Sequence, residues 1–376
     1  MKDGWKITTL AEIANCQIGL TYKPTDVVDD GGTIVLRSSN IQNSKIALED
    51  IVRVNCDISP TKYVNDGDIL MCSRNGSFRL VGKVAKIEKL AEPMSFGAFM
   101  TIIRSEYNDF LFYFFQSLSF RKQIFVGQTA TINQITTKML SNTSVAIPPT
   151  KEQQHIVEEL DLLSSIIEKK KAQLNELDNM AQSLFYEMFG DPITNEKGWE
   201  VKKLKNVSTL LNGRAYKQDE LLSEGKYKVL RVGNFFTNSN YYYSDLELED
   251  NKYCDNGDLL FAWSASFGAF IWQGEKVIYH YHIWKVLFDD KKLNKIYYQY
   301  LLNTMTKSFM NDVHGIGMVH LTKVGMEQYM LPVPPVALQQ RFASKIEAIE
   351  HQKELIKQSI KEVETLLNSR MDYYFN

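Results

Sequence analysis

Residues 147–156 read IPPTKEQQHI, and residues 333–342 read VPPVALQQRF. In both segments a proline pair precedes two adjacent glutamines and a long charged run. Proline fixes the backbone φ near about −65° and is tolerated in the first turn of a helix, so each pair predicts the end of one element and the start of a long helix. Because the same arrangement recurs 186 positions later, the chain is predicted to contain two copies of one unit.

Other segments support this duplication. Residues 4–6 (GWK) recur as 198–200 (GWE), and residues 36–40 (LRSSN) recur as 230–234 (LRVGN), both at an offset of 194 positions. The segment NDGDIL at 65–70 matches NGDLL at 256–260 with an offset of 190. Small loop deletions in the second copy explain why the offset falls along the chain.

Apolar residues after each proline pair alternate in steps of four and three, the spacing of a coiled-coil seam. The connection near residues 189–192 is short, and a parallel helix pair would need a long return, so antiparallel pairing is favoured. A helix lying on the core of its own domain is the alternative for each stripe. Lys170, Lys353, Arg370 and Tyr374 occupy polar or aromatic seam positions. The predicted apolar seam is Ile156, Leu160, Leu163, Ile167, Leu174, Leu177 and Leu184, with Phe342, Ile346, Ile349, Ile356, Ile360, Val363 and Leu367.

Each copy begins with short β-branched and aromatic runs, such as 33–36, 69–72 and 277–288, and has a helical segment later, near 109–125 and 295–311. The sequence therefore predicts an α+β fold with two homologous mixed domains, residues 1–150 and 191–335. Two long helices, residues 151–190 and 336–376, would join them as an antiparallel coiled coil with approximate two-fold symmetry.

Composition indicates an ordinary folded protein, with 44% apolar and 23% charged residues. The N-terminal segment lacks a signal peptide's apolar stretch, and no apolar run approaches the roughly 20 residues that span a bilayer, so we expect a cytoplasmic location. The formal net charge of −2 gives no chain-wide signature of nucleic-acid binding. Residues 1–150 hold 16 basic and 14 acidic side chains, whereas residues 151–190 hold 4 and 8, so acidity is concentrated in the first long helix.

Two domains held apart in opposed orientation would suit two half-sites on duplex DNA. The loop after the Gly-Asp strand differs between the copies, CSRNGSFR at 72–79 against AWSASFG at 262–268. Arg and Asn can read base edges, and basic residues shared by both copies suit phosphate contacts. The predicted DNA-contacting residues are Lys23, Arg37, Asn40, Arg74, Asn75, Ser77, Arg79, Asn133 and Gln134 in the first copy, and Lys217, Arg231, Asn234, Trp263, Ser264, Ser266, Phe267 and His320 in the second.

Each of these residues has a structural alternative. Arg37 and Asn40 could tie down a loop at the end of a strand, and Arg74 or Arg79 could be solvated charges. Trp263 and Phe267 could belong to the core.

Catalytic motifs are not evident. Residues 76–83, GSFRLVGK, have the wrong glycine spacing for a phosphate-binding loop. His280 and His282 would share one face of a strand, but no third metal ligand follows at a suitable spacing. The four cysteines form no C-x-x-C pair, so neither a zinc site nor a disulfide framework is predicted.

The Gly-Trp starts, the GDIL and GDLL strands, the P-P-x-x-x-Q-Q helix starts and the segment SLFYEMFGDP at 183–192 together resemble the specificity (S) subunit of type I restriction-modification systems. This resemblance implies a non-catalytic subunit with two target-recognition domains, each reading half of a split DNA site. It also implies two methyltransferase subunits that methylate adenine with S-adenosylmethionine, and restriction subunits that use ATP and Mg²⁺. No cofactor is expected in this chain.

Three other interpretations remain open from the sequence. A type IIB-like specificity chain would share this layout. A coiled-coil scaffold that binds proteins would lack affinity for duplex DNA even beside a methyltransferase. A nuclease or methylase acting alone would need an acidic metal cluster or a cofactor loop.

Overall fold

The computed structural model describes residues 4–125, 133–237, 240–264, 266–311 and 321–376. It divides into two compact units, Met1–Lys171 with Gln358–Asn376, and Ala172–Lys357. Both divisions fall inside the long helices α5 (Thr150–Phe189) and α9 (Val336–Phe375), so each helix contributes to both units. None of the helices in the described ranges combines the length and apolarity that crossing a membrane requires.

The first unit is built on two four-stranded sheets. One has the order β2-β11-β8-β9 and the other β10-β4-β7-β3, while β1 pairs with β12 and β5 with β6. The strands are β1 (Lys6–Thr9), β2 (Asn15–Ile18), β3 (Val27–Val28), β4 (Thr33–Leu36), β5 (Ile41–Gln42), β6 (Lys45–Ile46), β7 (Arg53–Val54), β8 (Ile69–Cys72), β9 (Val84–Lys86), β10 (Met94–Phe96), β11 (Met100–Arg104) and β12 (Ser144–Ile147). The shorter helices are α1 (Leu10–Ile13), α2 (Asn108–Gln116), α3 (Leu118–Phe125) and α4 (Thr137–Ser141).

The second unit repeats this plan, with sheets ordered β14-β21-β18-β19 and β16-β15-β20-β17 and the pair β13-β22. Its strands are β13 (Val201–Lys203), β14 (Ser208–Asn212), β15 (Tyr227–Leu230), β16 (Tyr242–Ser244), β17 (Tyr253–Cys254), β18 (Leu259–Ser264), β19 (Ser266–Ile271), β20 (Val277–Tyr279), β21 (Ile283–Phe288) and β22 (Met330–Pro332). Its shorter helices are α6 (Val232–Thr237), α7 (Lys295–Asn311) and α8 (Lys323–Gln328).

The duplication predicted from the sequence is confirmed by the strand pairing. β4 pairs in parallel with β10, and β15 pairs in parallel with β20. A Cβ added at Gly19 would lie 2.2 Å from the carbonyl oxygen of Gly97, and one added at Gly213 would lie 2.3 Å from that of His280. The same close backbone approach thus occurs in both copies and explains why each needs glycine there.

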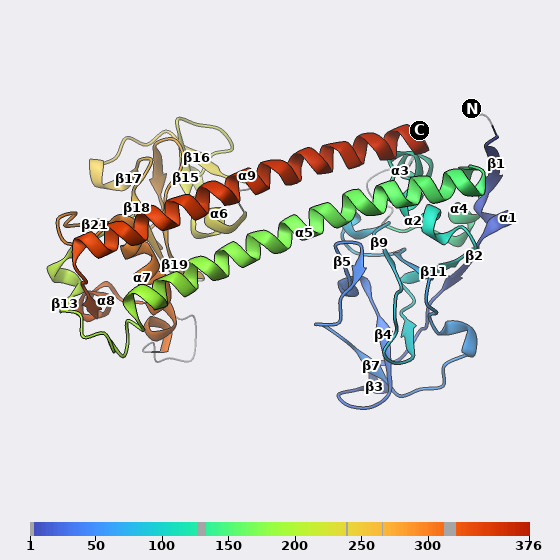
Figure 1. The fold of residues 1–376 in the computed structure, drawn as a ribbon, viewed down its shortest axis with the longest axis horizontal. Coiled ribbons are helices and arrows are strands. Elements are labelled where there is room, and N and C mark those ends of the chain that lie inside the picture. Colours follow the sequence, from blue (N-terminus) through green and yellow to red (C-terminus); the bar gives the residue numbers. More distant parts are fainter. Residues whose placement is uncertain (1–3, 126–132, 238–239, 265, 312–320) are drawn as a thin grey trace. The chain divides into compact units, whose positions relative to one another are not determined.

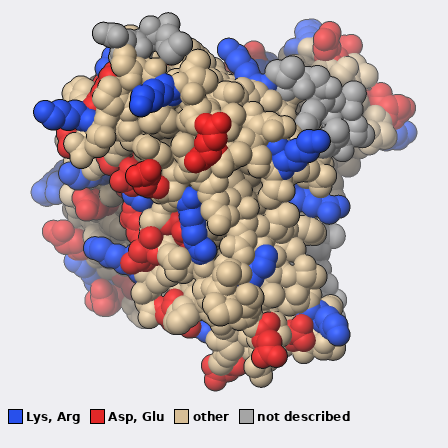
Figure 2. Space-filling view, turned by 90° about the vertical axis from the view of Figure 1, so that its right-hand side faces the viewer, with Lys and Arg blue, Asp and Glu red and all other residues tan. Residues whose placement is uncertain are grey.

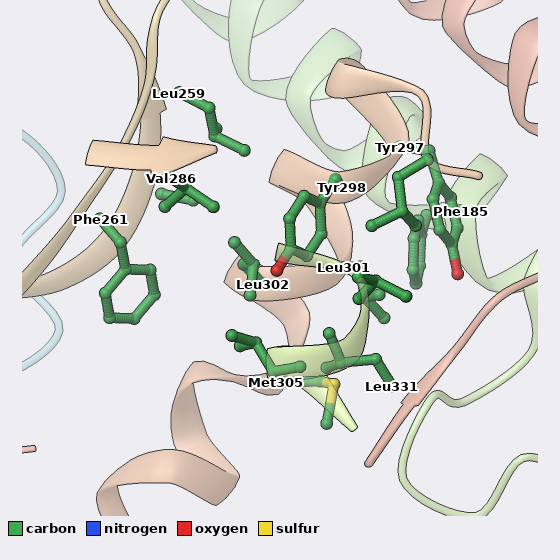
Figure 3. Packing of buried hydrophobic residues seen from close by; sticks show 14 of the residues in the cluster. Phe185, Leu259, Phe261, Val286, Tyr297, Tyr298, Leu301, Leu302, Met305 and Leu331 are labelled. Carbon is green, nitrogen blue, oxygen red and sulfur yellow. The ribbon is translucent and has the colours of Figure 1, made fainter. Parts of the chain in front are cut away.

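The core of the second unit lies between its antiparallel sheet and the helices. Figure 3 shows Tyr298, Leu301 and Leu302 of α7 between the strands that carry Leu259, Phe261 and Val286 and the helix that carries Phe185. Phe185 is fully buried and its ring lies 5.8 Å from that of Phe342. The end of α5 and the start of α9 therefore belong to the same core.

The proline pairs serve one purpose in both copies. Gln153 donates its side-chain amide to the carbonyl of Pro148 at 2.7 Å, and Gln339 does the same to Pro334 at 2.7 Å. Gln339 is fully buried and also accepts from the backbone N–H of Asn294 at 2.7 Å. The first glutamine of each motif thus supplies a donor to the carbonyl of the first proline.

Pairing of the two long helices is antiparallel, as predicted (Figure 1, green and red). In the first unit, Arg370 of α9 binds Glu159 of α5 through two hydrogen bonds, at 2.5 and 2.9 Å. In the second unit, Lys353 of α9 lies 2.7 Å from Asp178 of α5. The start of each helix therefore meets the end of the other.

The seam is continuous with the domain cores. Ile156, Leu160, Leu163, Ile167, Phe342, Ile346, Ile349 and Ile360 are buried, and Leu174, Leu177, Leu184, Ile356, Val363 and Leu367 are half-buried. The apolar stripe of each helix therefore serves both as a coiled-coil seam and as a face that lies on a domain core. The buried ends of each helix also pack on the core of a unit. The polar side chains of the seam at the end of α9 are hydrogen-bonded, since Tyr374, like Arg370, donates to Glu159, in its case at 2.5 Å.

Candidate nucleic-acid interface

The predicted reading loop of the first unit lies beside the segment that begins at Asn133. Ile135 donates its backbone N–H to the carbonyl of Ser73 at 2.7 Å, and Asn75 donates to the backbone oxygen of Asn133 at 3.3 Å. The side-chain amide of Asn133 donates to the oxygen of Gly76 at 3.1 Å. The fold thus brings together two segments about 60 residues apart that both hold predicted DNA-contacting residues.

Arg74, Ser77, Arg79 and Gln134 present exposed side chains on this surface. The guanidinium of Arg74 lies 5.3 Å from the centre of the Phe99 ring, within cation–π range. Asn75 was predicted to contact DNA, but its side-chain amide is hydrogen-bonded within the protein. It donates to Ser38 Oγ at 3.0 Å and accepts from the backbone N–H of Ser77 at 2.9 Å. Asn75 shapes the loop, and the exposed side chains around it are the groups available for contact.

Asn40 does not fit the predicted role of a base reader. It is fully buried, accepts from the backbone N–H of Arg37 at 2.8 Å, and donates to the carbonyls of Ala47 and Asp50 at 2.8 and 2.9 Å. The Nη2 of Arg37 donates to both carboxylate oxygens of Asp50 at 3.0 Å. The alternative that these residues hold the loop at the end of β4 is therefore the one the contacts support.

Lys23 and Lys217 occupy equivalent places in the two units. Both side chains are exposed at the start of a short 3₁₀ turn. Their backbone N–H groups donate to Asp26 Oδ2 at 2.7 Å and to Glu220 Oε2 at 2.8 Å. The turns hold each backbone in place while leaving the ammonium groups exposed.

In the second unit the predicted loop is an extension of the sheet. β18 and β19 pair antiparallel, with Trp263 opposite Phe267 and Ser264 opposite Ser266. Ser264 is 2% exposed, which removes it from the contact surface. Trp263 and Phe267 are half-buried against the core, which agrees with their structural alternative, and Ser266 is half-buried.

Arg231 is an exposed cation at the end of β15. Its guanidinium lies 5.0 Å from the centre of the Tyr242 ring, and its backbone N–H donates to Asn234 Oδ1 at 2.9 Å. Asn234 is 7% exposed and so plays the same structural part as Asn40. His320 lies outside the described residues.

The turn formed by His280, Tyr281 and His282 was not predicted from the sequence. These residues link β20 to β21 and do not share one strand face. Burial, then the nearby His282 and Arg231, lower the pKa of His280 to about 4, so its ring is neutral at pH 7. Trp263 donates from Nε1 to the carbonyl of Tyr281 at 2.9 Å. Among the described residues no group of three His, Cys, Asp or Glu is placed to hold a metal.

Charge is distributed without a dominant sign on the face shown in Figure 2, where basic and acidic side chains are interspersed. This agrees with the near balance of charges over residues 1–150, 16 basic against 14 acidic. Among the described residues, this face thus presents no large basic patch of the kind that binds the DNA backbone.

Two copies of one mixed domain, each followed by a long helix that packs against the other, define a duplicated and helix-linked architecture. Residues 2–179 and 196–365 match the family described as type I restriction modification DNA specificity domain. The chain belongs to this family.

Individual relatives agree with this assignment. The EcoKI specificity subunit of Escherichia coli (strain K12) is 27% identical over 288 residues, which cover 69% of this chain and 61% of that protein. The StySPI specificity subunit of Salmonella potsdam is 23% identical, over 98% of this chain and 87% of that protein.

Solved structures share the fold. A chain from a study of complex assembly and conformational transition of the type I R-M system superposes with a TM-score of 0.60 at 17% identity, covering 99% of this chain and 97% of that one. The type I restriction-modification S subunit from M. genitalium gives a TM-score of 0.54 at 11% identity, with 99% and 96% covered.

Proposed function

We propose that this chain is the DNA specificity subunit of a type I restriction-modification complex and that it reads a bipartite, asymmetric target. The observation that carries the proposal is a duplicated backbone frame whose side chains differ between the copies after β8 and in the equivalent β18–β19 segment. Similar frames would place two reading surfaces in the same way on DNA, and unlike side chains would make the two half-sites differ. Family membership supports the same role.

Methylation and cleavage would belong to partner subunits. We infer that two methyltransferase subunits and the restriction subunits assemble with this chain, and that S-adenosylmethionine, ATP and Mg²⁺ bind to those partners. The near-neutral first domain supports this division, because a specific complex needs phosphate contacts that this chain would supply only in part. We expect the complex to act in the cytoplasm.

The long helices would set the length of the unread gap between half-sites. Contacts that tie each unit to its helices support this idea: Trp5 donates to Glu152 Oε2 at 3.0 Å, and Trp199 donates to the carbonyl of Phe189 at 2.8 Å. Inserting four residues after Lys170 would lengthen α5 by about 6 Å and rotate the second half of the helix about its axis. The insertion is expected to shift the gap or abolish activity.

The decisive experiment is methylation by the purified chain mixed with its methyltransferase partner. Sequencing of modified positions should give one bipartite asymmetric motif. Exchange of residues 1–150 for the corresponding domain of another specificity subunit should change one half-site and leave the other intact. A change in both half-sites would contradict the proposal, and absence of duplex binding beside the partner would favour a protein-binding scaffold.

A further inference from the structure

Each unit carries a short turn between its parallel-paired strand and an interior strand of the antiparallel sheet. Residues 97–99 join β10 to β11, and residues 280–282 join β20 to β21. Ser73 and Arg74 donate their backbone N–H groups to Phe99 O at 2.9 and 3.0 Å, and Trp263 donates to His282 O at 3.1 Å. In both copies the turn is thus bonded to the strand end from which the predicted reading segment begins.

A second set of backbone contacts holds these turns from the other side. Leu20 forms a bridge with Gly97, and Arg214 forms the equivalent bridge with His280. Gly19 and Gly213 allow the approach, because a Cβ at either position would collide with backbone oxygen atoms. Backbone contacts on both sides make each turn a fixed platform for whichever side chains it carries.

The turn of the first unit displays an aromatic ring beside a cation. Phe99 is 58% exposed although it is a large apolar side chain. Its ring lies against the guanidinium of Arg74, with 5.3 Å between the Arg74 Cζ and the ring centre. An exposed aromatic ring on a rigid turn, paired with arginine, is typical of an interaction surface.

The turn of the second unit displays hydrogen-bonding groups instead. Tyr281 is 39% exposed, and the rings of His280 and His282 lie 4.8 Å apart. Burial first lowers the pKa of His280 to about 4, which leaves a neutral imidazole. Its Nδ1 accepts from the backbone N–H of His282 at 3.4 Å, so the other ring nitrogen carries the proton and can donate. Such groups can hydrogen-bond to base edges, and a neutral ring lacks the charge that strengthens a hydrogen bond to phosphate.

We propose that these two turns are equivalent base-reading elements, one for each half-site. Phe99 contacts an apolar group in the major groove, such as a thymine methyl, and orients Arg74 toward a guanine. Tyr281 and the adjacent histidines hydrogen-bond to base edges of the other half-site. This inference rests on the proposed function. It adds Phe99, His280, Tyr281 and His282 to the residues predicted to contact DNA.

The test uses the full chain in complex with its methyltransferase partner. Phe99→Ala and Tyr281→Ala are each assayed on duplex libraries in which every position of the target is randomised in turn, and the methylated products are sequenced. Leu118→Ala is the matched control, because this side chain is 52% exposed on α3, outside the turns and the reading loop. Thermal melting of each variant checks that the exposed substitutions leave the fold intact.

Phe99→Ala is expected to reduce discrimination by about tenfold at one or two adjacent base pairs of one half-site, the size of a single lost base contact. Tyr281→Ala is expected to do the same in the other half-site only, and Leu118→Ala should change neither. Unchanged base preference in both turn variants, or an equal loss for every duplex, overturns this inference while leaving the proposed function standing. Failure of the unaltered complex to methylate any specific sequence counts instead against the proposed function.

Discussion

Replacing Asn40 with alanine separates its structural role from the predicted reading role. The substitution removes three hydrogen bonds of a fully buried amide, one accepted from Arg37 N and two donated to the carbonyls of Ala47 and Asp50. Neutral hydrogen bonds contribute about 1 kcal/mol each, so the loop should lose about 3 kcal/mol of stability. That loss corresponds to an increase of about a hundredfold in the population of the opened loop.

Hydrogen exchange followed by mass spectrometry measures this opening in peptides that cover residues 33–50. Gln42→Ala is the control in the same loop, because Gln42 is exposed and its side chain donates to Ser39 O at 2.9 Å, so the change should alter stability by less than about 0.5 kcal/mol. Protection of this loop that equals that of the wild type, combined with altered base preference, would refute the structural assignment and restore Asn40 as a base reader.

Three further substitutions test other parts of the structure. Lys23→Ala should weaken binding to all duplexes and lower the slope of log affinity against log salt by about one, as measured by titration at several salt concentrations. Phe185→Ala empties a fully buried site and should cost about 3–5 kcal/mol in the free energy of unfolding of its unit, measured by urea denaturation. Arg370 holds the pKa of Glu159 below its ordinary value, so the pair stabilises the fold above pH about 4.3 and its contribution falls as the pH drops through the lowered pKa. Glu159→Gln should therefore melt below the wild type at pH 7 and approach it at acid pH.

The helices and the duplication could be predicted because their signals are long and repeated. The stripe from Ile156 to Ile167 extends over several turns, and its partner stripe in α9 has the same spacing. Each P-P-x-x-x-Q-Q motif gives a local signal whose meaning is visible in the bonds of Gln153 and Gln339 to the proline carbonyls. Periodicity over many residues outweighs local ambiguity.

Single side chains could not be assigned in this way, because residue type alone does not decide whether a side chain is buried or exposed. Asn40 and Arg74 both have residue types that suit base readout, yet Asn40 is enclosed by its own loop and Arg74 is exposed. The segment around Ser264 and Ser266 looks like a loop by composition, but pairing between β18 and β19 makes it part of a sheet. Tertiary pairing overrode local propensity there.

The turn at 280–282 was missed for a related reason, since HYH contains none of the residues that usually mark a turn. Its conformation is imposed from outside, by the close approach of Gly213 and by the N–H of Trp263. The equivalent turn at 97–99 is held by Gly19 and by the N–H groups of Ser73 and Arg74 in the same manner. Because backbone atoms hold both turns, their side chains can differ as widely as Phe99 and His282 without loss of the frame. If the turns read DNA as proposed, the target could change at the turn while the strands beneath it stay the same.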